Sequence, residues 1–167
     1  YNKGVRSFVV DNNTSSNTIS SCNKATFFVV EDTLEALQKI AAYHRNNYNV
    51  PTIGVTGSNG KTIVKEWLYQ ILSPEMSVAR SPKSYNSQIG VPLSVWQLND
   101  SHQLAIFEAG ISRPNEMQKL KDIIQPTIGI FTNIGQAHGK NFDDINHKIE
   151  EKLKLFTDVK TLIYCSD

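Results

Sequence analysis

A short glycine-containing segment followed by lysine and threonine has the strongest chemical potential in this sequence. Gly57-Ser58-Asn59-Gly60 follows a β-branched stretch, and Lys61-Thr62 opens a stretch with apolar residues at helical spacing. Glycines let several backbone N–H groups approach one anion, and the first turn of a helix adds partial positive charge. The segment therefore predicts a phosphate-binding loop. In it Lys61 reaches the terminal phosphates and the Thr62 hydroxyl ligates Mg²⁺.

The predicted loop is shorter than the general pattern G-x-x-x-x-G-K-[ST], whose first glycine would fall at Val55. An ordinary glycine-rich turn is the alternative interpretation. We favour the phosphate-binding loop because Gly60-Lys61-Thr62 stands between a predicted strand, 53–56, and a predicted helix. The apolar residues of that helix are Val64, Trp67, Leu68, Ile71 and Leu72.

Other polar residues follow predicted strands. Glu108 ends the apolar stretch 104–107, where a carboxylate can ligate Mg²⁺, although a solvated strand-end carboxylate is the alternative. Asn133 and His138 lie in the polar loop after the strand 127–131. His138 is a candidate for binding metal or phosphate, and Asn133 for hydrogen bonding to a nucleotide. A surface histidine and a turn-forming asparagine are the alternatives.

Lys152 is predicted to point inward. Residues on one face of the helix expected over 143–156 are Ile145, Ile149, Lys152 and Phe156. Lys148 and Lys154 fit the solvent-facing side better. An inward lysine needs a partner or a modification, and the alternative is a side chain that carries its charge back to water.

Asn86 lies in a polar loop, 82–86, after a predicted strand. Such a loop can face the γ-phosphate of a nucleotide, although the residues alone favour a structural turn.

Strands and helices alternate from residue 51 onward. We predict strands at 5–10, 26–30, 53–56, 77–80, 104–108, 127–131 and 161–164. We predict helices that begin at Thr33 and Lys61 and helices over 89–98, 115–124 and 143–156. The polar stretch 11–23 is expected to be a loop. Alternation of this kind predicts an α/β fold with right-handed crossovers, a mostly parallel sheet and ligands at the carboxyl ends of its strands.

Composition narrows the functional classes. The net charge of +1 gives no argument for nucleic acid, and no apolar stretch approaches the roughly 20 residues of a membrane span. Cys22 and Cys165 are expected to be reduced thiols.

The chain begins without Met and begins and ends within apparent α/β units, so we expect a fragment with a domain boundary near residue 50.

Four blocks in order resemble the Mur ligase family. They are 56–62; Asn86 with Gly90-Val91-Pro92; Glu108-Ala109-Gly110 with Glu116-Met117; and Thr132-Asn133-Ile134-Gly135 through His138, with Lys152 downstream. The chain departs from the family at Ile63, where a second Thr is common, and at Gly139-Lys140, where an apolar or acidic pair is commoner.

The resemblance implies that residues 51–167 form part of a central ATP-binding domain. It implies that residues 1–50 are the C-terminal part of a UDP-substrate-binding domain. It implies ATP contacts from residues 57–62, Asn86 and Asn133, Mg²⁺ ligation by Thr62, Glu108 and His138, and catalytic roles for Lys61, His138 and Lys152. In the family, CO₂ converts the lysine that Lys152 matches to a carbamate, which serves a second metal ion.

Within the family, Val64-Lys65-Glu66 and the block at Glu108 are most similar to the members that add D-alanyl-D-alanine to UDP-N-acetylmuramoyl-tripeptide. The resemblance thus implies a monomeric, ATP-dependent peptidoglycan-synthesis ligase of the bacterial cytoplasm, with ligase activity absent from the fragment alone. Alternatives are a diamino-acid-adding Mur ligase, a folylpolyglutamate synthase or a P-loop regulator. A GTP-binding regulator usually recognises guanine with an Asn-Lys-x-Asp motif after the phosphate-binding loop. The nearest match, Asn23-Lys24-Ala25-Thr26, precedes the loop and lacks the Asp.

Overall fold

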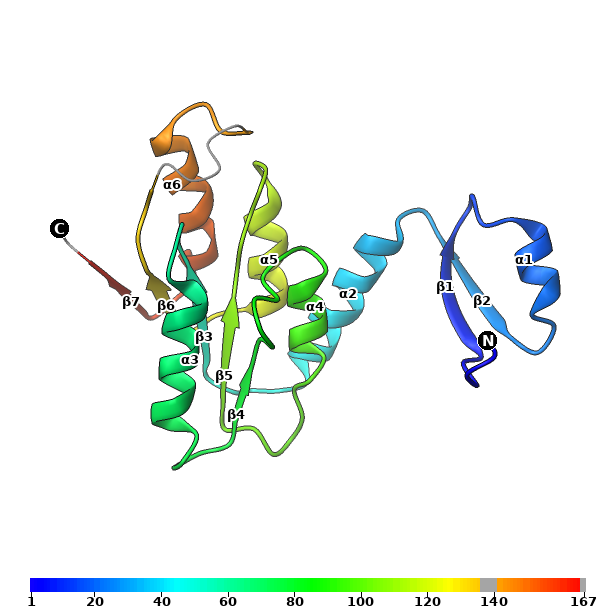
Figure 1. Ribbon diagram of the computed structural model, residues 1–167, viewed down its shortest axis with the longest axis horizontal. Coiled ribbons are helices and arrows are strands. Elements are labelled where there is room, and N and C mark those ends of the chain that lie inside the picture. The colour runs from blue at the N-terminus through cyan, green and yellow to red at the C-terminus, as the bar shows by residue number, and fades with distance from the viewer. Residues whose placement is uncertain (136–140, 166–167) are drawn as a thin grey trace.

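The computed structural model describes residues 1–135 and 141–165, and it contains two sheets (Figure 1). The larger is a five-stranded parallel sheet with the strand order β4-β5-β3-β6-β7. Its strands are β3 (Thr52–Thr56), β4 (Val78–Arg80), β5 (Leu104–Glu108), β6 (Ile128–Phe131) and β7 (Thr161–Tyr164). The predicted α/β fold with a mostly parallel sheet is therefore confirmed.

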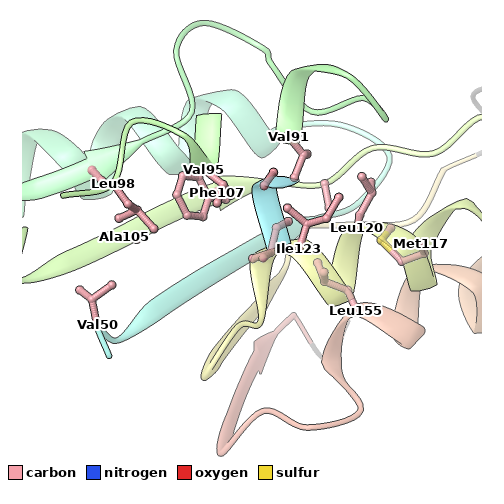
Figure 2. Packing of buried hydrophobic residues seen from close by; sticks show 14 of the residues in the cluster. Val50, Val91, Val95, Leu98, Ala105, Phe107, Met117, Leu120, Ile123 and Leu155 are labelled. Atoms are coloured by element: carbon pink, nitrogen blue, oxygen red, sulfur yellow. The ribbon is translucent and has the colours of Figure 1, made fainter. Parts of the chain in front are cut away.

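Helices cover both faces of this sheet. They are α3 (Lys61–Leu72), α4 (Gly90–Val95), α5 (Glu116–Ile124) and α6 (Ile145–Leu153), which continues into the 3₁₀ helix η2 (Lys154–Phe156). Val64, Leu68 and Leu72 of α3 pack on one face, whereas Trp67 and Ile71 are exposed. α4, α5 and η2 pack in a separate cluster with β5, which Figure 2 shows.

The two central strands are buried along their whole length. Every residue of β3 and of β5 is buried, because helices cover both faces of a parallel sheet. The chain leaves β3 through α3 to the edge strand β4, and later crosses from β5 through α5 to β6 on the other side of β3. The connections through α3 and α5 therefore lead to opposite sides of β3. Such a topological switch point opens a crevice at the carboxyl ends of the strands.

A separate two-stranded sheet precedes the larger one (Figure 1). β1 (Ser7–Asp11) and β2 (Thr26–Val30) are parallel, and the rings of Phe8 and Phe27 stack between them. The predicted loop at 11–23 is wrong in part, because this stretch contains the helix α1 (Ser16–Ser21), capped by Ser15. Parallel neighbours need a crossover connection, and α1 lies in that crossover.

Helix α2 (Thr33–Asn46) links the two sheets and packs on α4 and α5. The helix begins at Thr33, as predicted, and its N-cap is Asp32, whose side chain accepts hydrogen bonds from two backbone N–H groups of the first turn. Ala41 belongs to the same core cluster as Val91 and Leu120. The buried Arg45 side chain donates to the Ile124 carbonyl at 3.0 Å, so α2 is fastened to the larger unit. The boundary near residue 50 remains a prediction.

Within the described residues, no helix has the length and apolar character needed to cross a membrane.

Candidate nucleotide-binding site

The glycine loop between β3 and α3 has a backbone shape that needs glycine. Gly57 has φ +146° and Gly60 has φ +79°, both in the region that side chains disfavour. A Cβ at Gly57 would also lie 2.0 Å from Thr132 Oγ1. Gly60 is the N-cap of α3 and provides no side-chain cap, so the first N–H groups of the helix remain available to an anion.

The loop after β6 braces this glycine loop. Asn133 accepts through its backbone carbonyl from Ser58 N at 2.9 Å and through Oδ1 from Asn59 N at 3.0 Å. Gly135 N donates to Ser58 Oγ at 2.9 Å. The structure thus places Asn133 against the loop, where it shapes the backbone, and its predicted nucleotide contact remains a prediction.

Glu108 lies next to the loop because β3 and β5 pair in register, with Val55 opposite Glu108. Its side chain is fully buried. Oε2 accepts from Thr62 Oγ1 at 3.1 Å and from Asn86 Nδ2 at 3.3 Å. Oε1 lies 3.1 Å from Lys65 Nζ and otherwise has no hydrogen-bond partner among the described residues. Three predicted site residues, Thr62, Asn86 and Glu108, therefore meet.

Lys65 is a site residue that the sequence patterns did not reveal. It is fully buried and donates to the Ser81 carbonyl at 2.7 Å and to the Lys83 carbonyl. These bonds fix the segment that carries Asn86, whose carbonyl accepts from Gly110 N at 2.7 Å. Lys65 follows Thr62 by nearly one helical turn, so the two side chains share a side of α3, and this spacing was the available signal.

Lys152 points inward, as predicted, and reaches the glycine loop. Its Nζ donates to the Gly57 carbonyl at 3.0 Å, and Lys61 Nζ donates to the same oxygen at 3.0 Å. Burial, together with the smaller effect of the charges of Lys61 and Lys148, lowers the pKa of Lys152 to about 8. Burial also lowers the pKa of Lys61, and Glu108 partly opposes that change.

The predicted solvent-facing position of Lys148 is wrong. Lys148 is only 5% exposed, and its Nζ donates to the Gly135 carbonyl at 2.9 Å. Conversely, Ile145 is 45% exposed, and Lys154 is half-buried and pairs with Glu151. The inner side of α6 meets polar loops rather than the sheet, so charged residues occupy it. Lys148 precedes Lys152 by about one helical turn, and that spacing alone could have placed both on one side.

Several of these residues, but not Thr62 or Glu108, line a cavity of about 220 Å³ at the carboxyl ends of β3 and β5. It is lined by Gly57, Ser58, Lys61, Asn86, Ser87, Gly110, Ile111, Ser112, Lys148 and Lys152.

His138 lies outside the described residues, so its predicted metal and catalytic roles remain predictions. The part of the chain that is described contains no cluster of three or more His, Cys, Asp or Glu suited to a metal. Cys22 and Cys165 are free thiols.

Residues 55–167 match the family model of the Mur ligase middle domain. The chain belongs to the Mur ligase family. The match begins in β3 and covers every element of the Mur ligase site described above.

Curated Mur ligases resemble the chain in sequence. A UDP-N-acetylmuramoyl-tripeptide–D-alanyl-D-alanine ligase from a Synechocystis species is 45% identical over 111 residues, which are 66% of this chain and 24% of that protein. The ligase of the same name from Bacillus subtilis is 33% identical over 142 residues, 83% of this chain and 31% of that protein. The chain thus spans between a quarter and a third of the length of these relatives.

A solved Mur ligase has the same fold. The crystal structure of the MurF ligase from Thermotoga maritima in complex with ADP superposes with a TM-score of 0.84 at 26% identity. The superposition covers all of this chain and 45% of that one.

Proposed function

We propose that this chain is the nucleotide-binding part of an ATP-dependent amide ligase that adds D-alanyl-D-alanine to UDP-N-acetylmuramoyl-tripeptide. One observation carries the proposal: Lys61, Thr62, Glu108 and Lys152, which are far apart in sequence, meet at one end of the sheet. The names of the curated relatives support the choice of substrates.

The nucleotide's phosphates would lie against residues 57–62. Backbone N–H groups at the start of α3 face that position, and Lys61 now donates to the carbonyls of Gly57 and Ser58. A phosphate is a stronger acceptor for an ammonium group than a neutral carbonyl is, so Lys61 would exchange these bonds for phosphate contacts. The Thermotoga maritima ligase was solved in complex with ADP, which supports nucleotide binding by a chain of this fold.

The residues fit a magnesium ion as well. Mg²⁺ prefers oxygen ligands, and the Thr62 hydroxyl and Glu108 Oε2 lie 3.1 Å apart beside the phosphate position. Lys65 neutralises the other carboxylate oxygen, so Glu108 would present one oxygen. The bound ion would neutralise charge on the transferring phosphoryl group. His138 is proposed as a further ligand.

The reaction would proceed through an acyl phosphate. A carboxylate oxygen of the peptide substrate attacks the γ-phosphorus, and the bond to the β-phosphate oxygen breaks to release ADP. The amine of D-alanyl-D-alanine then attacks the acyl carbon and expels phosphate, while the amine loses a proton. The chain supplies no nucleophile in this scheme. Lys61 would stabilise the charge on the phosphoryl oxygens.

Carbamylation of Lys152 is part of the proposal. Only a neutral amine adds CO₂, and a pKa of about 8 leaves a substantial neutral fraction near neutral pH. The product is an anion, formed with release of a proton. The charges of Lys61 and Lys148, which disfavour an ammonium here, would favour that anion.

Residues 1–50 are proposed to include the C-terminal part of a UDP-substrate-binding domain. The separate pairing of β1 with β2, away from the larger sheet, supports a distinct unit there. A monomeric state and a cytoplasmic location, where ATP is available, complete the proposal.

The test measures ADP release by the whole protein, with UDP-N-acetylmuramoyl-tripeptide and a panel of amines. Release that depends on D-alanyl-D-alanine supports the proposal. Release only with a diamino acid or with glutamate would instead identify a different ligase of the family. Tight GTP binding without ATP preference would indicate a regulator.

A further inference from the structure

The cavity beside the glycine loop has a surplus of positive charge. Lys61, Lys148 and Lys152 line it, and the described lining includes no carboxylate. Glu108 lies close enough to raise the pKa of Lys61, but one of its oxygens is paired with Lys65. Two of these ammonium groups, those of Lys61 and Lys148, remain when Lys152 is carbamylated. Like charges in so small a space repel one another, so the cavity favours a negatively charged ligand.

Lys148 is tied to the glycine loop through a short hydrogen-bond chain. Its Nζ donates to the Gly135 carbonyl at 2.9 Å, and Gly135 N donates to Ser58 Oγ at 2.9 Å. The side chain is 5% exposed, so the walls of the cavity restrict the position of the ammonium group. Lys148 also lowers the pKa of both Lys61 and Lys152, which shows that the three charges act on one region.

We propose that Lys148 is a third phosphate-binding lysine of this site and contacts the terminal phosphate that ATP has and ADP lacks. The inference rests on the proposed function. In phosphate-binding loops, backbone N–H groups serve the inner phosphates and the loop lysine reaches the outer ones. A further ammonium group that lines the same cavity as that lysine therefore belongs with the outermost phosphate, where the triphosphate has its additional negative charge.

The test compares two nucleotides in the whole protein by titration calorimetry at fixed ionic strength with Mg²⁺. Lys148→Met should lower the affinity for a non-hydrolysable ATP analogue on the order of tenfold or more, as expected for one lost charge-assisted contact. Its affinity for ADP should change by less than about threefold. Unchanged affinity for the analogue would overturn the proposal, and so would equal losses for both nucleotides.

Lys160→Met is the matched control. Lys160 is exposed and precedes β7 at the opposite end of the sheet, so its removal changes net charge equally and should leave both affinities unchanged. Lys148→Gln provides the same comparison if Lys148→Met does not fold, because it keeps a hydrogen-bond donor without the charge. If the wild-type protein binds neither nucleotide, the proposed function falls as well. If the wild type binds and the Lys148 variants match it, only this inference falls.

Discussion

Lys65 Nζ lies 3.1 Å from Glu108 Oε1, and neither side chain is exposed to solvent. Removing one member of a buried ion pair leaves the other charge without compensation, at a cost of about 3–5 kcal/mol. Lys65→Met should therefore lower the free energy of unfolding by about that amount in urea denaturation.

Lys39→Met serves as its control, because Lys39 pairs with Glu35 on the exposed face of α2. Such exposed pairs contribute little to stability, because water screens their charges. A loss below about 1 kcal/mol for Lys65→Met would contradict the importance of the buried pair.

Gly57→Ala should weaken nucleotide binding. The new Cβ would lie 2.0 Å from Thr132 Oγ1 and 3.0 Å from the Asn133 carbonyl, so the loop that braces the site must move. We expect the affinity for ADP to fall by about tenfold or more in titration calorimetry.

Gly4→Ala offers a matched comparison for that substitution. Gly4 also has a positive φ, +90°, but a Cβ there would meet nothing within 4 Å. It should cost about 1 kcal/mol of backbone strain and leave ADP binding intact. Normal ADP binding by Gly57→Ala would show that the loop does not contact phosphate.

Lys152 should make stability depend on pH in a predictable direction. Its pKa is lowered from 10.5 to about 8, so between these values the folded protein binds fewer protons than the unfolded chain does. Stability contributed by this group therefore rises with pH across that window, because the cost of burying the charged ammonium disappears.

The wild type should gain roughly 2 kcal/mol relative to Lys152→Met between about pH 7.5 and about pH 9.5. Urea unfolding in CO₂-free buffer measures this difference. Parallel stability profiles for the two proteins would mean that Lys152 titrates normally.

The sequence was sufficient for the main sheet and for the meeting of Thr62, Asn86 and Glu108, while the roles of the site residues stay predictions. β3 was predictable from its β-branched residues and β5 from a continuous apolar stretch, a pattern typical of strands buried on both faces. Glu108 and Asn86 were predictable as a group because the carboxyl ends of parallel strands meet.

Several sequence-based predictions were wrong because the local pattern does not reveal the polar or exposed surroundings of a residue in the fold. Lys65 and Lys148 are buried although neither belongs to an apolar pattern, because both donate hydrogen bonds to loop carbonyls and Lys65 also pairs with Glu108. Trp67 is 63% exposed although it has the helical spacing of a buried residue. Helix α1 was missed because its Ser, Thr and Asn residues favour turns, whereas the parallel pair β1–β2 needs a crossover.

The most direct test is a crystal structure of the whole protein with Mg²⁺ and a non-hydrolysable ATP analogue. The outer phosphates should lie within hydrogen-bond distance of Lys61, and the ion should be ligated by Thr62 and Glu108 beside Lys152. A nucleotide bound elsewhere, with these four side chains in their present contacts, would contradict the account.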